Sequence, residues 1–139
     1  SEGHHNTAVG QSALFNNTLG AHNTAIGHGA LGGNSSGSHN IASGSDADVM
    51  SGDLTHAVAI GAHAKVETSY AMALGGTGED ALNVGIGVSA PQRTLHVNAV
   101  MRLEPIPEAP SNPSAGDLYF DSTLSMLRVY DGNAWQNCW

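Results

Sequence analysis

The chain has 139 residues, a formal net charge of −8 and only four lysine and arginine residues, so it forms one ordinary domain or two small ones. So few cations exclude the basic footprint of a nucleic-acid-binding protein and the polybasic face of a membrane-surface module. No apolar run approaches the roughly 20 residues that span a bilayer, so we expect no membrane insertion. A single cysteine, Cys138, excludes an intramolecular disulfide and a multi-cysteine metal site.

Alanine makes up much of the 40% apolar content, and large side chains are scarce. A folded chain must offset about 1–2 kcal/mol of conformational entropy per residue, and alanine-sized side chains bury little area. The chain is therefore either disordered or a narrow object that gains burial by repetition and association. Because no charged residue occurs from Gly3 to Ser45, the composition does not favour disorder.

A repeat occupies the N-terminal part of the chain. The segments His-Asn-Thr-Ala-Val-Gly, His-Asn-Thr-Ala-Ile-Gly, His-Asn-Ile-Ala-Ser-Gly and His-Ala-Val-Ala-Ile-Gly end at Gly10, Gly27, Gly44 and Gly61, a constant spacing of 17 residues. A related unit ending at Gly75 follows after 14 residues. Helical repeats need about 34 residues, so the period excludes them. Two short strands and two turns fit the period, which predicts one coil of a parallel β-solenoid per repeat.

The alternation within each repeat predicts two faces. Residues such as Thr24 and Ile26 should point to one side of the strand and Ala25 to the other. We expect the larger side chains to form the interior, in a column that contains Val9, Ile26, Ser43 and Ile60. The third repeat departs from the pattern, and Asp46–Asp53 is expected to be a protruding or looser turn.

The Asn-Thr-Ala-Val-Gly-x-x-Ala-Leu and Ala-Val-Ala-Ile-Gly units resemble the β-roll of trimeric autotransporter adhesin heads and the related repeats of phage tail fibres. Asn83–Gly87, Leu95–Val97 and the stretch from Gly116 to Trp135 resemble segments that accompany such repeats. The resemblance implies an all-β chain: a left-handed parallel β-roll in a homotrimer, followed by a small C-terminal module rich in β-hairpins. It also implies an extracellular place, on a bacterial surface fibre or a phage virion tail.

The expected organisation has three parts: the β-roll in residues 1–76, a transition or neck in 77–100, and the C-terminal β module, a candidate tip, in 101–139. Three prolines predict a stiff extended connector over Glu104–Asn112. Leu118–Phe120 and Met126–Tyr130 read as the strands of a hairpin, and Asp131-Gly132 signals a second turn.

No motif for hydrolysis, nucleotide binding or metalloprotease chemistry occurs, so we expect no enzyme, no catalytic residue and no cofactor. One histidine per repeat (His5, His22, His39, His56) forms a column. A metal site needs several converging ligands, so we expect no metal there and instead a turn position whose side chain hydrogen-bonds the backbone or the neighbouring asparagine.

Five of the seven aromatic residues fall after residue 118, near amide and carboxylate groups. Flat aromatic faces beside such groups suit sugar binding, although the same residues could form the core of a trimer. The candidate ligand-binding residues are Trp135, Trp139, Tyr130, Asp131 and Asn133. The sequence thus favours a fibre tip that recognises a cell-surface receptor, such as a glycan. The alternatives are a structural spacer and trimerisation module, or a fibre-borne polysaccharide-degrading enzyme.

Overall fold

The structure, a computed structural model, describes residues 3–139. The chain divides between Asn98 and Ala99 into two compact units, each with its own strands. The fold is all-β apart from one 3-10 turn, η1 (Gly78–Asp80).

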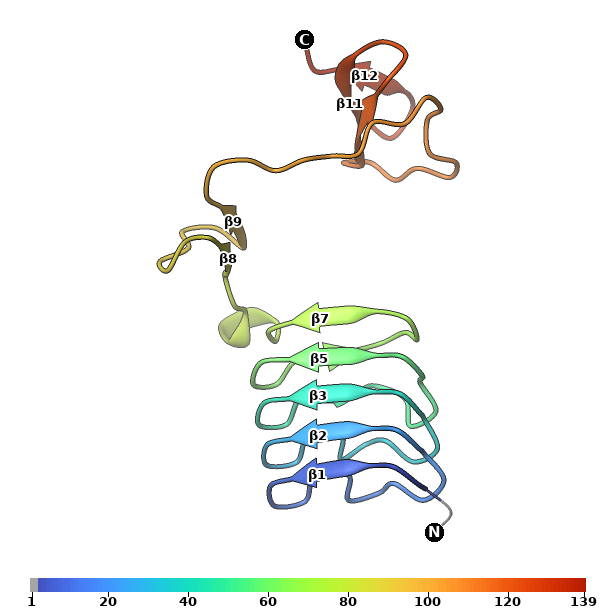
Figure 1. The fold of residues 1–139 in the computed structure, drawn as a ribbon, viewed down its shortest axis with the longest axis vertical. Helices are drawn as coiled ribbons and strands as arrows, with labels where there is room; N and C mark the ends of the chain where they lie inside the picture. The colour runs from blue at the N-terminus through green and yellow to red at the C-terminus, as the bar shows by residue number, and fades with distance from the viewer. Residues whose placement is uncertain (1–2) are drawn as a thin grey trace. The chain divides into compact units, whose positions relative to one another are not determined.

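The first unit is a parallel β-solenoid, as the repeat predicts. Its main wall is a five-stranded parallel sheet in the order β1-β2-β3-β5-β7 (Figure 1). The strands are β1 (Thr7–Val9), β2 (Thr24–Ile26), β3 (Ile41–Ser43), β5 (Val58–Ile60) and β7 (Met72–Leu74). Each repeat pairs in register with the next, so that Ala8 lies beside Ala25 and Ala25 beside Ala42. The 17-residue period is therefore the length of one coil, and β7 belongs to the shorter fifth unit.

The second wall contains strands only in the third and fourth coils, where β4 (Asp48–Val49) pairs in parallel with β6 (Lys65–Val66). The prediction of a protruding or looser turn over Asp46–Asp53 is therefore wrong for the centre of this segment, which forms β4. The Asp48 carboxylate accepts the backbone N–H of Gly33 at 3.0 Å, and the side chain of Val49 is buried in the roll. This wall accommodates an aspartate because its carboxylate accepts a hydrogen bond from a backbone N–H of the preceding coil.

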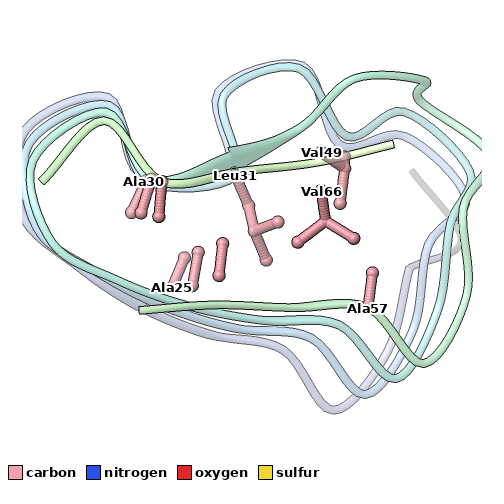
Figure 2. Close-up of a cluster of buried hydrophobic side chains, with 10 residues drawn as sticks. Ala25, Ala30, Leu31, Val49, Ala57 and Val66 are labelled. Carbon is pink, nitrogen blue, oxygen red and sulfur yellow. The ribbon is translucent and has the colours of Figure 1, made fainter. Parts of the chain in front are cut away.

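The inner face of the main sheet carries alanine rather than the larger side chains of its strands. Ala25 and Ala42 are completely buried, whereas Ile26 is 47% exposed. Opposite this alanine column, the core is completed by Ala30, Leu31, Val49 and Val66 (Figure 2). The expected interior column of Val9, Ile26, Ser43 and Ile60 is thus wrong, because it lies on the outer face. The two walls approach so closely that methyl groups on one of them fill the space.

Asparagine side chains tie successive coils together inside the roll. Asn23 and Asn40 are completely buried. The Asn23 Oδ1 accepts the backbone N–H of Asn40, and the Asn40 Oδ1 accepts that of Ala57, each at 2.9 Å. The Asn23 Nδ2 donates to the Gly37 carbonyl at 2.8 Å. Each buried amide is satisfied at both ends, as buried polar groups require, and the column ends at Ala57 because alanine has no amide.

Glycine closes each strand because the stacking leaves no room for a side chain. Gly27 and Gly44 have φ of +130° and +140°, a region that L-residues with a side chain rarely adopt. A Cβ added to Gly27 would lie 2.5 Å from the carbonyl oxygen of Gly44 in the next coil. The glycine column is therefore required both by the backbone conformation and by the spacing of the coils.

The roll is followed by η1 and by a short parallel pair, β8 (Val84–Ile86) with β9 (Leu95–Val97). Leu82 lies against the last glycine of the roll, since a Cβ on Gly75 would meet the Leu82 side chain at 2.8 Å. The backbone N–H of Gly76 also donates to the carbonyl of Asp80. The C-terminal end of the roll is thus covered by the chain that leaves it.

The second unit is a three-stranded antiparallel sheet in the order β10-β11-β12. The expected hairpin is present as β10 (Leu118–Asp121) and β11 (Met126–Tyr130), and β12 (Trp135–Asn137) adds a strand that the sequence did not predict. The proline-rich connector is not a free spacer, because Ile106 exchanges backbone hydrogen bonds with Phe120 and Ser122. The connector is therefore held along the edge of β10.

Candidate functional site

The outer face of the main sheet is an exposed and mainly apolar surface of the roll. It consists of the two columns of strand side chains that flank the buried alanines, and we call it the outer stripe. Six of its large side chains are exposed: Val9, Ile26, Ile41, Ile60, Met72 and Leu74. No residue of either column is charged. A continuous uncharged stripe of exposed aliphatic side chains is typical of a surface that another molecule covers.

Beside the outer stripe, the histidine column forms a stack of rings that Tyr70 continues. Neighbouring ring centroids in this stack lie 4.7–4.9 Å apart, and the planes are tilted by at most 17°. All five residues have positive φ, near +60°. The column is a turn position, as expected, but its imidazoles stack on one another instead of bonding the backbone. Rings stacked face to face do not give the convergent ligands of a metal site.

A second set of histidines and aspartates runs along another corner of the roll. The His63 Nδ1 lies 2.9 Å from an Asp80 carboxylate oxygen, and its Nε2 lies 3.8 Å from Asp46. His28 lies 3.6 Å from the other oxygen of Asp46. The groups form an open chain along the coils. Within residues 3–139, no three His, Cys, Asp or Glu side chains are grouped to hold a metal ion.

Two of the candidate ligand-binding residues form the core of the second unit. The Trp135 ring packs edge-on against Tyr119, with centroids 4.7 Å apart, and lies 5.3 Å from the Tyr130 ring. Trp135 and Tyr130 are half-buried, and Tyr119 is buried. These contacts hold β10, β11 and β12 together within one chain, whereas the alternative that the sequence left open for these residues was the core of a trimer.

The next two candidates, Asp131 and Asn133, belong to the turn between β11 and β12. The Asp131 Oδ1 accepts the backbone N–H groups of Asn133 and Ala134, each at 2.8 Å, and Oδ2 accepts the Gln136 side-chain amide. Hydrogen bonds, first from the Ala134 N–H, then from Asn133 and Gln136, lower the pKa of Asp131. The carboxylate is therefore occupied in shaping the turn.

A polar network lies beside the Trp135 cluster. The buried Asp121 accepts the N–H groups of Thr123 and Leu124 through Oδ1 and the Tyr119 hydroxyl, at 2.9 Å, through Oδ2. The Leu124 N–H is the largest of the interactions that lower the pKa of Asp121, against an opposing effect of burial. Arg128 lies 3.6 Å from this carboxylate and donates to the Trp135 carbonyl at 2.7 Å. The network links β10, β11 and β12 through polar side chains.

The fifth candidate, Trp139, lies at an open hollow of the second unit. Its side chain is 71% exposed. It borders an apolar pocket of about 560 Å³ that is lined by Val100, Met101, Arg102, Leu103, Pro105, Phe120, Leu127 and Trp139. The single cation of this lining, Arg102, pairs with Glu104 at 3.1 Å. The structure thus separates the five candidates into a core pair, a turn pair and one pocket residue.

Sequence reasoning missed most of this pocket, since Phe120 and Leu127 read as alternating strand residues and Met101 only as the start of the C-terminal module. It also missed the asparagine column, although the 17-residue spacing of Asn6, Asn23 and Asn40 was a visible signal. Asparagine was read there as a turn former. Cys138 is exposed and unpaired.

No protein-family model, curated protein or solved structure matches the chain. Within residues 3–139, the structure contains no helix that is long and apolar enough to cross a membrane.

Proposed function

We propose that this chain is part of a trimeric fibre that works in attachment outside the cell, on a bacterial surface or a phage tail. The observation that carries the proposal is the outer stripe, where the large aliphatic side chains of the roll face outward while alanine fills its interior. Three parallel copies would cover the three stripes around a common axis. The number three comes from the resemblance of the repeats to trimeric adhesin heads and tail fibres.

The energetics of the roll support association through this surface. Complete burial of a valine, isoleucine, leucine or methionine side chain contributes about 1.5–3 kcal/mol, and the outer stripe holds six such exposed side chains per chain. The interior core consists largely of alanine, which contributes less. Each copy also carries a net charge of −8, so three copies carry 3 × −8 = −24. An uncharged stripe is the face on which such copies can approach one another.

The oligomer is tested by light scattering of the whole chain after size exclusion. We expect a mass three times that of the 14.2 kDa chain. Ile26→Lys places a charge in the middle of the outer stripe and should dissociate the trimer, since three buried cations would meet near the axis. Ser36→Lys, on an exposed turn, is the matched control and should leave the mass unchanged. A folded monomer in the unmodified protein would refute the proposal.

We further propose that the ligand, a surface glycan, binds at the apolar pocket beside Trp139. The support is the exposed indole face next to Phe120, because sugar rings pack their C–H groups on flat aromatic surfaces. Weak single sites would gain avidity from three copies. Binding to a glycan array, abolished by Trp139→Ala in a protein that remains folded and trimeric, tests this assignment. Asn133→Ala, on the exposed turn, serves as the comparison variant.

A structural spacer without a ligand is the second candidate function. The observation that favours it is that Tyr130, Trp135 and Asp131 already have partners within the second unit. A trimer that binds no glycan on the array, with an accessible Trp139, would support the spacer and contradict the receptor-binding tip.

A further inference from the structure

The two ends of the roll differ in how their backbone groups are paired. At the C-terminal end, Leu82 and η1 lie against the last coil. At the N-terminal end, β1 is an edge strand of the sheet. Edge strands present unpaired N–H and C=O groups and are templates for the addition of another strand. The question is which strand the edge of β1 would accept.

The contacts between successive coils define the answer, because the same hydrogen bonds recur along the roll. The N–H of Asn23 donates to the side chain of Asn6, and that of Asn40 to Asn23. The carbonyl of Asn23 accepts the N–H of Thr7, at 2.8 Å. The N–H of Gly27 donates to the carbonyl of Val9, also at 2.8 Å. Among the bonds between coils, each coil therefore offers the coil before it the N–H groups of this asparagine and this glycine and the carbonyl of the asparagine.

In the first coil, the equivalent groups are the N–H of Asn6, the carbonyl of Asn6 and the N–H of Gly10. Within residues 3–139, none of the three has a hydrogen-bond partner. Gly10 has the same positive φ as Gly27, at +125°, so this edge already has the conformation of an internal coil. Its side-chain column, Ala8, continues the alanine column that is buried further along the roll.

We propose that the edge of β1 is an interaction surface for one more coil of the repeat's own chemistry, which adds as a parallel, in-register strand. The partner segment carries an asparagine to accept the Asn6 N–H, a small residue opposite Ala8 and a glycine at the turn. An extended strand without the asparagine leaves the Asn6 N–H unpaired, so the edge distinguishes repeat coils from other strands. This addition needs no second copy of the chain.

The test inserts a second copy of residues 21–37 between Gly3 and His4, which preserves the spacing of the repeat. The matched control carries the same insertion with Asn23→Ala and Ile26→Pro in the inserted copy only. These changes remove the side-chain acceptor and one backbone donor that would face the first coil. Amide hydrogen exchange at Asn6 and Gly10 is the readout, and Asn23 and Gly27 of the original roll serve as internal references.

With the matching coil, exchange at Asn6 and Gly10 should slow by about tenfold or more relative to the unmodified protein and the control. The reference amides should stay protected in all three proteins. Equal exchange at Asn6 and Gly10 in the matching and control insertions would overturn the proposal. Loss of protection at Asn23 and Gly27 with the matching coil would also overturn it, because a compatible coil cannot open the roll that it extends.

Discussion

The side-chain oxygen of Asn23 accepts the backbone N–H of Asn40, the residue one coil further along, at 2.9 Å. Both residues are completely buried, so water cannot reach the Asn40 N–H. The pairing of the strands does not satisfy this N–H either, and the Asn23 side chain takes that place. The same relationship links Asn6 to Asn23 and Asn40 to Ala57. The asparagine column is thus a second ladder that runs beside the sheet and sets the register of the coils.

Asn23→Ala should destabilise the roll. The change leaves the N–H of Asn40 buried without a partner, which costs about 1–3 kcal/mol, whereas the Gly37 carbonyl keeps the Asn34 side-chain amide as a donor. We therefore expect a loss of about 1–3 kcal/mol in the free energy of unfolding, measured by denaturant titration. Asn16→Ala, whose side chain is exposed and bonds one carbonyl, is the control and should lose less than about 1 kcal/mol. Equal losses would show that the column is not a stabilising element.

Gly27→Ala should be among the most damaging small substitutions in the chain. The new Cβ would meet the Gly44 carbonyl oxygen at 2.5 Å and would hold an L-residue at φ +130°. We expect a loss of about 3 kcal/mol or more, seen as a lower Tm in circular dichroism. Gly78→Ala is a fair comparison, because Gly78 also has positive φ but no atom lies within 4 Å of its Cβ position. That variant should cost only about 1 kcal/mol of backbone strain.

Trp135→Ala should unfold the second unit rather than simply remove a ligand contact. The indole packs against Tyr119 and Tyr130, and its deletion leaves a cavity that costs about 3–5 kcal/mol. Near-ultraviolet circular dichroism of the tyrosines should lose its signal. Trp139→Ala removes an exposed ring and should leave that signal intact. A folded second unit in the Trp135 variant would restore this residue as a candidate ligand contact.

The second unit should lose stability in acid. The pKa values of Asp121 and Asp131 are lowered below 3.8 by hydrogen bonds, led by the N–H of Leu124 and of Ala134. A carboxyl group with a lowered folded-state pKa stabilises the fold above its unfolded pKa, and the contribution disappears as the pH falls through the folded value. Tryptophan fluorescence, which reports only on this unit, should show a constant melting temperature above about pH 5 and a decline below about pH 4.

The contribution of Asp131 to this acid response can be tested with a single substitution. Asp131→Asn removes one of the two groups, so the melting temperature should depend less on pH below about pH 4, the unfolded pKa of an aspartate. The turn should be weaker at neutral pH, because an amide accepts the Ala134 N–H less strongly than a carboxylate does. An unchanged pH profile would mean that Asp131 does not contribute to the acid transition.

The sequence by itself determined the solenoid, because a constant 17-residue spacing of glycine and alanine places equivalent residues on successive coils whatever their chemistry. It also determined that Thr24 and Ile26 share one face and Ala25 takes the other, since strand side chains alternate. The hairpin of β10 and β11 followed from alternation and turn residues in the same local way. These features depend on contacts between residues whose spacing along the chain is fixed.

Only the tertiary structure decided which face of the strand lies inside. Burial of the most apolar side chains favours Ile26 in the interior, yet the distance between the two walls admits only the methyl group of Ala25. The same holds for Trp135 and Trp139, two tryptophans of one short C-terminal stretch, of which the first is half-buried and the second exposed. Trp135 lies on β12, a strand that the sequence did not predict, and pairs with Tyr130 on β11, whereas Trp139 follows the last strand and stays exposed. Wall separation and strand pairing arise between segments that are distant in sequence, so no local pattern could specify them.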